Sequence, residues 1–158
     1  MNEEPSVAGV REVSWLGLRN IIRQCYETAR AHGWWEKYDD ALNPSAPAQE
    51  FLEEIIATKL MLAVSELSET LEEVRAGKDP KEVYYTRSQK ILPDGTKFPI
   101  PCEKEPGAKP EGVPIELADV VIRVFDLAEW LGIDLVSAIQ EKMNYNESRE
   151  YRHGGKKL

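Results

Sequence analysis

The chain has 158 residues, a length that suits one domain with a substantial core. Its residues are 42% hydrophobic and 30% charged, as in ordinary globular proteins, and its formal net charge of −8 argues against a nucleic-acid polymer as a partner. The longest apolar runs are far shorter than the about 20 residues that span a bilayer, so we expect no membrane segment.

The start of the chain and its cysteines bear on the compartment. The N-terminal residues MNEEPSVAGV lack the basic and apolar regions of a signal peptide. Cys25 and Cys102 are the only cysteines, which favours two free thiols in a reducing compartment. Two cysteines are also too few for a structural zinc site made of cysteines. We therefore expect a cytoplasmic protein.

The first half of the chain carries two helical patterns separated by a proline-containing loop. The first predicts a helix from about Val13 to about His32, ended by Gly33, because glycine is favoured just past a helix C-terminus. The second predicts a helix from about Gln49 to Ala76, ended by Gly77. Apolar residues spaced by four and three along this helix predict a packed seam of Leu60, Val64, Leu67, Leu71 and Val74.

Residues 78–112 break the helical pattern with several prolines and glycines. Two short stretches, YYTRSQKIL and TKFPI, flank Pro93-Asp94-Gly95, which is a favourable turn sequence. We expect an irregular segment or a β-hairpin here, inserted between two helices.

A third helix is predicted from about Pro114 to Trp130, because proline is tolerated in the first helical turn, and Gly132 ends it. Asp134 is a suitable N-cap for a fourth helix from Leu135 to about Glu147. Much of the circumference of the third helix is apolar, and one predicted seam consists of Leu117, Val121, Val124, Ala128 and Leu131.

Four helices joined mostly by short links predict an all-α fold that resembles a four-helix bundle. Residues 1–158 are expected to form one helical domain, with the insertion at about 78–112 and a basic C-terminal tail at about 148–158. The apolar seams are wide for a single bundle of this size, so we expect a homodimer or a homotetramer.

Two short acidic motifs lie within the helical sequence. They are Glu66-Leu67-Ser68-Glu69 in the second helix and Glu116-Leu117-Ala118-Asp119 in the third. Residues three apart share a helix face, so each motif points two carboxylates the same way. The two negative charges repel each other, and burial near a core makes this more unfavourable. A bound cation would attract both carboxylates. Because Mg²⁺ prefers carboxylate oxygens, the four acids are candidate magnesium ligands, with solvated surface acids as the alternative.

The C-terminal part of the chain mixes basic and aromatic residues. Arg and Lys bind phosphate, while Tyr, Asn and His can contact a base or a sugar. Next to a magnesium site, such a segment suits a nucleoside polyphosphate; the alternative is a solvated C-terminus without a binding role. The residues concerned are Lys142, Tyr145, Asn146, Arg149, Tyr151, Arg152, His153, Lys156 and Lys157.

Other motifs do not support a different chemistry. The sequence contains no P-loop, nucleophile elbow or dinucleotide fingerprint. Glu150-Tyr151-Arg152-His153 has the spacing of a di-iron ligand motif, but such sites need two copies and the chain has only two histidines. Trp34 and Trp35 follow the first helix, where core or interface packing is favoured over stacking on a base.

The segment SELSETLEE, followed by ELADVVIRVFDLAEWLGIDL, resembles the MazG-like all-α nucleoside triphosphate pyrophosphohydrolases. Their signature is Glu-x-x-Glu and then Glu-x-x-Asp on adjacent helices, and the ending EKMNYNESREYRHGGKKL is similar to a phage or bacterial subgroup. The resemblance covers residues 34–158 and implies an oligomeric helical bundle. It implies that Mg²⁺, or Mn²⁺ in its place, is held by Glu66, Glu69, Glu116 and Asp119. It also implies substrate contacts from Lys142, Asn146, Arg149 and Tyr151, and Arg152 of the basic tail is a further candidate.

The activity that the resemblance implies is Mg-dependent hydrolysis of a nucleoside triphosphate between its α- and β-phosphates, giving a monophosphate and pyrophosphate. The carboxylate of Glu66 or Glu69 would orient the attacking water or deprotonate it as the general base. The gap between Glu69 and Glu116 is longer than the typical family spacing, which leaves the choice of base and sugar open. A non-catalytic nucleotide-binding sensor or adaptor and a structural helical oligomer are the alternatives.

Overall fold

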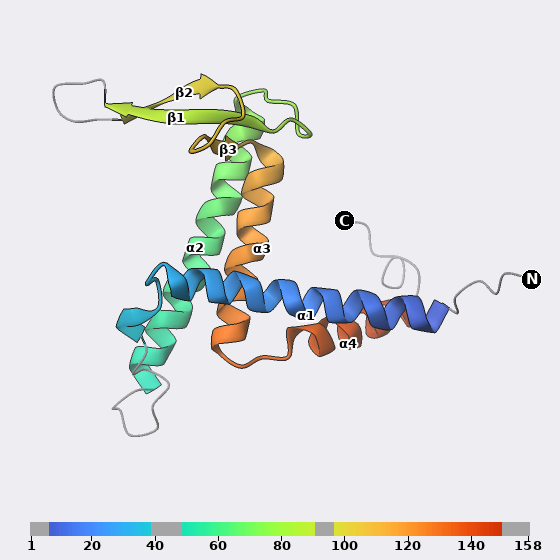
Figure 1. Ribbon diagram of the computed structural model, residues 1–158. Helices are drawn as coiled ribbons and strands as arrows, with labels where there is room; N and C mark the ends of the chain where they lie inside the picture. The colour runs from blue at the N-terminus through green and yellow to red at the C-terminus, as the bar shows by residue number, and fades with distance from the viewer. Residues whose placement is uncertain (1–6, 39–48, 91–96, 150–158) are drawn as a thin grey trace, which may run out of the picture. The chain divides into compact units, whose positions relative to one another are not determined.

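The structure is a computed structural model that describes residues 7–38, 49–90 and 97–149 (Figure 1). The chain divides into two compact units: a terminal unit, Met1–Asp39 with Phe125–Leu158, and a central unit, Asp40–Val124. The elements in chain order are α1 (Val7–Ala31), α2 (Gln49–Arg75), β1 (Tyr84–Lys90), β2 (Lys97–Cys102), β3 (Lys109–Glu111), α3 (Val113–Trp130) and α4 (Leu135–Glu147).

All four predicted helices are present. The bounds of α4 are as predicted, and α2 and α3 differ from their predicted bounds by one residue. Three helices end at the predicted glycines Gly33, Gly77 and Gly132, where the last carbonyls accept backbone N–H groups from the glycine and the residue after it. α1 begins at Val7, six residues before the predicted start, since a helix tolerates the intervening Gly9 at a cost of about 1 kcal/mol.

The prediction of an all-α fold is wrong, although the chain is mostly helical. The strands β1, β2 and β3 form a three-stranded antiparallel sheet with the order β2-β1-β3 (Figure 1). The predicted hairpin is formed by β1 and β2, whereas β3 was not predicted because Lys-Pro-Glu has low strand propensity. The predicted turn Pro93-Asp94-Gly95 lies outside the described residues.

The predicted apolar seam of α2 is also wrong, because its members are exposed. About half of the surface of each residue remains accessible, from 46% for Val64 to 52% for Val74. The buried positions of α2 are instead Ile55, Lys59, Ala63 and Glu66. Apolar spacing alone did not determine which side of α2 faces inward, because hydrogen bonds from Arg123 hold Glu66 on the buried side.

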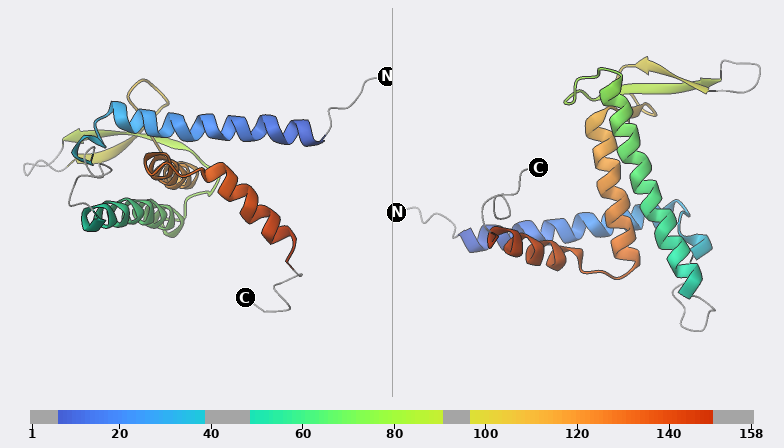
Figure 2. Two further views of the ribbon diagram at one scale, coloured as in Figure 1. Left: turned by 90° about the horizontal axis from the view of Figure 1, so that it is seen from below. Right: turned by 180° about the vertical axis from the view of Figure 1, so that it is seen from behind.

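The residues of the predicted α3 seam belong to two different units. Leu117, Val121 and Val124 are exposed in the central unit, and Ala128 is buried in the terminal unit. In the central unit, α2 and the first part of α3 lie side by side, and the sheet lies at one end of this helix pair (Figure 2). This arrangement brings strand residues close to the helix positions that carry the acids.

An aromatic cluster forms the core of the terminal unit. Trp35 is fully buried and stacks on Trp130, with ring centroids 4.6 Å apart. The indole N–H of Trp35 donates a 2.6 Å hydrogen bond to the buried carboxylate of Asp126. Trp35 is therefore a core residue, as predicted, whereas Trp34 is 53% exposed.

No helix in the described part of the chain is long and apolar enough to cross a membrane. Both cysteines lie within this part, and both are free thiols, as predicted. Burial, followed by the nearby charge of Asp126, raises the pKa of the Cys25 thiol, so Cys25 is less reactive than an exposed cysteine.

Candidate metal centre

Three of the four predicted acids come together in the central unit. Glu66 of α2 and Glu116 and Asp119 of α3 each offer a carboxylate oxygen, and these oxygens all lie within 4.8 Å of one another. Glu116 and Asp119 share a face of α3 because they are three residues apart. Glu66 and Glu116 are buried, with 7% and 4% of their surfaces exposed. Two helices thus direct three acids to one largely buried place.

The fourth predicted acid, Glu69, lies on the exposed side of this group. Glu69 is three residues after Glu66 on α2, and its side chain is exposed. Its charge is one of the causes that raise the pKa of Glu116, so the two carboxylates are near neighbours. Glu69 is not among the three acids whose oxygens converge, and its predicted catalytic role stays a prediction.

Arg123 holds Glu66 in place through a contact that the sequence does not predict. The Nε and Nη2 atoms of Arg123 donate hydrogen bonds of 3.1 and 2.9 Å to Oε1 of Glu66. Arg123 lies four residues after Asp119, on the acidic face of α3, and is the only Lys or Arg of that helix. This isolated cation on an apolar helix was the available signal for an acid partner.

The sheet contributes further polar groups to the same end of the helices. The hydroxyl of Tyr84 on β1 donates a 2.9 Å hydrogen bond to Oε1 of Glu73 on α2. Burial, followed by this hydrogen bond and charge, raises the pKa of Tyr84 to about 12, so the hydroxyl stays protonated. Oε2 of Glu73 is buried and has no hydrogen-bond partner among the residues that the structure describes.

A glycine connects the sheet to the acids of α3. Gly112 follows the last residue of β3, and its φ of 109° lies in a region that side chains rarely adopt. A Cβ atom there would come within 2.6 Å of the backbone oxygen of Glu82. The carbonyl of Gly112 accepts the backbone N–H of Glu116, which starts the helix. Gly112 therefore allows β3 to pass directly into the helix that carries two of the acids.

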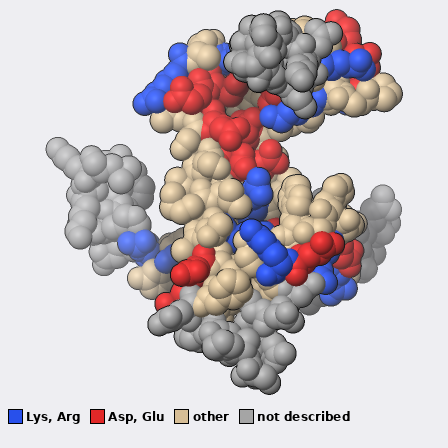
Figure 3. Space-filling view, turned by 90° about the vertical axis from the view of Figure 1, so that its left-hand side faces the viewer, with Lys and Arg blue, Asp and Glu red and all other residues tan. Residues whose placement is uncertain are grey.

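The electrostatic environment of the acids is short of positive charge. Burial, and then the charge of Glu69, raises the pKa of Glu116 even though Lys109 acts in the opposite direction. Burial, and then the charge of Glu66, raises the pKa of Asp119 against the effects of Arg123 and Lys109. Figure 3 shows acidic side chains gathered in one patch on this side of the molecule, with basic side chains at its edges. A divalent cation would relieve this repulsion.

The predicted substrate-binding residues are not part of the central unit. Lys142 and Asn146 lie on α4, and Arg149 follows it, all three exposed and in the terminal unit. Lys142 and Arg149 both lie near the ring of Tyr145, with Nζ at 4.9 Å and Cζ at 5.7 Å from its centroid. Tyr151 and Arg152 lie outside the described residues. The substrate contacts of all five residues stay predictions.

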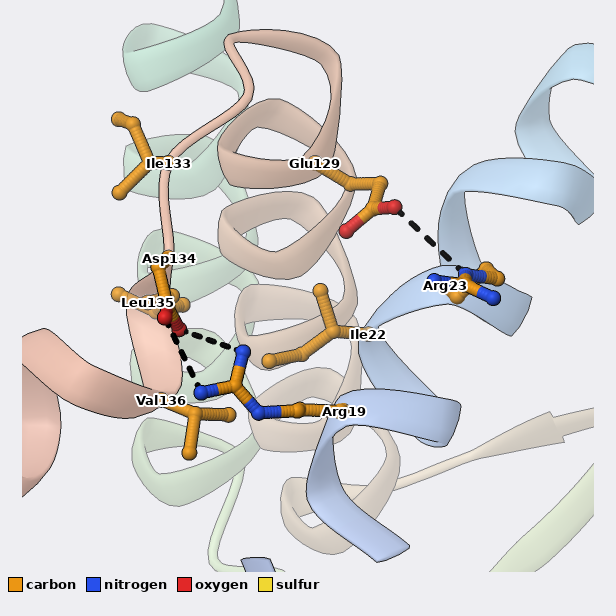
Figure 4. Close-up of a pocket in the computed structure, with 8 residues that line it drawn as sticks. All are labelled: Arg19, Ile22, Arg23, Glu129, Ile133, Asp134, Leu135 and Val136. Atoms are coloured by element: carbon orange, nitrogen blue, oxygen red, sulfur yellow. Dashed lines mark hydrogen bonds and ion pairs between the residues drawn. The ribbon is translucent and has the colours of Figure 1, made fainter. Parts of the chain in front are cut away.

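A hollow lies in the terminal unit, between α1 and the loop into α4 (Figure 4). Arg19 and Asp134 face each other across it with a 2.7 Å ion pair. Asp134 also caps α4 as predicted, and hydrogen bonds from Arg19 and then Ser137 lower its pKa to about 2. The hollow is lined by Arg19, Ile22, Arg23, Glu129, Ile133, Asp134, Leu135 and Val136. Since its charged groups are paired with one another, we assign it a role in fastening α1 to α4.

Comparisons of the chain with protein-family models, with curated proteins and with solved structures found no match.

Proposed function

We propose that the protein is a metal-dependent nucleoside triphosphate pyrophosphohydrolase that cleaves between the α- and β-phosphates. The observation that carries this proposal is the convergence of Glu66, Glu116 and Asp119 from two helices. These are three of the four acids that the resemblance to MazG-like enzymes assigns to magnesium. Arg123 pairs with only one of the three carboxylates, so this largely buried cluster favours further positive charge, which supports a binding role over a surface role.

The acids fit a hard divalent cation. Ligand oxygens on opposite sides of Mg²⁺ are about 4 Å apart, given bonds of about 2.1 Å. The three carboxylate oxygens lie within 4.8 Å of one another, so small side-chain adjustments would bring them to one ion. All donors are oxygens, which suits Mg²⁺ and also Mn²⁺. When bound, the cation would neutralise phosphate charge and polarise the phosphorus–oxygen bonds.

Other residues would have the remaining roles in catalysis and substrate binding. Arg123 fixes the orientation of Glu66, so this acid is ready to bind without a large loss of side-chain entropy. Glu69 is exposed next to Glu116, where it could accept a proton from water, and Glu66 is the other candidate for that role. Lys142, Asn146, Arg149, Tyr151 and Arg152 are proposed to hold the nucleotide and its phosphates.

The exposed apolar residues support the expected assembly into a homodimer or homotetramer. Leu60, Val64, Leu67, Leu71 and Val74 of α2 form a continuous exposed stripe, since they are spaced by four and three residues. Leu117, Val121 and Val124 are exposed on α3. Apolar surface of this extent usually marks an interface. Such an oligomer would act on nucleotide pools in the cytoplasm.

The proposal is tested by a hydrolysis screen in which the protein is incubated with Mg²⁺ and a panel of NTPs, dNTPs and modified triphosphates. We expect monophosphate and pyrophosphate as products, lost on chelation and in the Asp119→Ala and Glu69→Ala variants. Glu72→Gln is the matched control, since Glu72 is an exposed acid on α2 that pairs with Arg75. Wild-type rates in Asp119→Ala would contradict the proposal. No turnover with any substrate, but thermal stabilisation by Mg²⁺ and nucleotide, would favour the sensor alternative.

A further inference from the structure

One face of the sheet carries Lys109, which is paired with Glu111. Lys109 and Glu111 are two residues apart on β3, so their side chains lie on the same face of the sheet. Their partners on β1 are Thr86 and Tyr84 respectively, which share that face. Tyr84 reaches Glu73 of α2 through its hydroxyl, so this face is turned toward the helix ends that carry the acids.

Three residues on this face form a chain of contacts that ends in an ammonium group. Thr86, which is buried, donates a 2.9 Å hydrogen bond from its hydroxyl to Oε1 of Glu111. The other carboxylate oxygen, Oε2, lies 2.8 Å from Nζ of Lys109. The side chain of Glu111 is 15% exposed and that of Lys109 is 63% exposed. The hydrogen bond from Thr86 thus holds the Glu111 carboxylate in place, and Glu111 in turn pairs with the exposed ammonium group of Lys109.

Lys109 interacts with the acid cluster as well as with Glu111. Its charge acts on Glu116, Asp119 and Glu69, although none of these is its ion-pair partner in the structure. An ammonium group has three donor hydrogens, and the contact with Glu111 uses one of them. A cation with free donors at the edge of a carboxylate cluster suits a ligand that carries negative oxygens and brings its own divalent ion.

We propose that Lys109 binds the phosphate chain of the substrate, with Glu111 and Thr86 as the residues that position it. The ligand class is a metal-bound polyphosphate, and this inference rests on the proposed function of the acid cluster. The sheet, which lies between α2 and α3 in the sequence, is then part of the binding site. It supplies a phosphate contact from β3, the strand that leads directly into α3. Lys109 would donate a charge-assisted hydrogen bond to a phosphate oxygen while the acids hold the cation.

A different role for Lys109 makes a different prediction. If Lys109 served only as a counter-ion for the acids, its removal would strengthen cation binding and leave polyphosphate binding unchanged. If it contacts phosphate, its removal weakens polyphosphate binding, whatever happens to the cation. Lys104 provides a matched control, because it is an exposed lysine of the same insertion, 5.8 Å from the ring of Tyr85. Tyr85 alternates with Tyr84 and Thr86 along β1, so its side chain lies on the opposite face.

The experiment uses the full chain as wild type and as the Lys109→Met, Lys109→Arg and Lys104→Met variants. Isothermal titration calorimetry measures the binding of Mg²⁺ alone and of inorganic tripolyphosphate in excess Mg²⁺. We expect Lys109→Met to bind tripolyphosphate at least about tenfold more weakly, Lys109→Arg to recover most of the affinity, and Lys104→Met to match the wild type. In a hydrolysis assay, Lys109→Met should raise KM for the triphosphate more than it lowers kcat.

Equal tripolyphosphate affinity in the wild type and Lys109→Met would overturn the inference, as would equal losses in Lys109→Met and Lys104→Met. The binding measurement does not depend on turnover. If the wild type binds Mg²⁺–tripolyphosphate through Lys109 but hydrolyses no triphosphate, the proposed function fails and the phosphate contact stands. If the wild type binds no tripolyphosphate at all, the phosphate contact fails.

Discussion

Replacing Arg123 with methionine tests whether the ion pair with Glu66 organises the acid cluster. Methionine keeps most of the alkyl length and removes the charge and the donors. Glu66 would lose both hydrogen bonds to its Oε1 while 10% of its side chain is exposed. Hydrogen bonds to a charged group are worth about 1.5–3 kcal/mol, and the 28% exposure of Arg123 lets water replace part of the contact. We therefore expect the free energy of unfolding to fall by about 2 kcal/mol.

The control is Arg75→Met, which breaks a pair with Glu72 at nearly the same distance, 2.8 Å compared with 2.9 Å. The side chains of Arg75 and Glu72 are both about two-thirds exposed, so this pair contributes at most about 0.5 kcal/mol to the free energy of unfolding. Thermal unfolding followed by circular dichroism in the absence of metal should show a Tm decrease of about 4–8 °C for Arg123→Met. Arg75→Met should change Tm by about 1 °C. Equal effects of the two variants would refute the reasoning that burial makes the Glu66 contact strong.

For three further substitutions, the structure determines the direction of the effect on stability. Asp119→Asn should raise the Tm of the metal-free protein at pH 7: the pKa of Asp119 is raised on folding, so its contribution to stability is complete below its ordinary pKa and is lost as the pH rises through the raised value. In a pH series of melting curves this gain should vanish in acid, and a gain that persists there would contradict the reasoning. Trp35→Phe should lower the free energy of unfolding, measured by urea denaturation, by about 1.5–3 kcal/mol, because it removes the hydrogen bond to the buried Asp126. The control is Trp34→Phe at an exposed position, which should change this free energy by under about 0.5 kcal/mol. Gly112→Ala should cost more stability than Gly107→Ala, because both glycines have positive φ but only the first has backbone within 2.6 Å of the added Cβ; equal melting temperatures would show that the chain relaxes at Gly112.

Local signals predicted the helices well. The glycines that end α1, α2 and α3 and the aspartate that caps α4 act within one turn of the chain, so their effect is independent of distant packing. The acids Glu66, Glu116 and Asp119 were also identified from sequence, because a spacing of three on a helix fixes a shared face. Two of these three are buried in the structure.

Features that depend on contacts between distant segments were missed. β3 carries almost no strand signal in its three residues, and it forms because β1 offers an open edge that Lys109–Glu111 can pair with. The stripe from Leu60 to Val74 was predicted to be buried because its periodicity is strong, but periodicity does not say which partner covers it. The role of Arg123 required knowing that Glu66 lies opposite it on another helix. Each of these depends on a pairing that no local pattern encodes.

The most direct test of the metal centre is a calorimetric titration of Mg²⁺ into the metal-free protein at pH 7, with Glu116→Gln as the paired variant. Glu116 is 4% exposed and supplies one of the three converging carboxylates, and glutamine keeps its shape while removing its charge. We expect saturable binding by the wild type that is lost or at least about tenfold weaker in the variant. No binding to the wild type, or equal binding to both proteins, would contradict the assignment of Glu66, Glu116 and Asp119 as a metal centre.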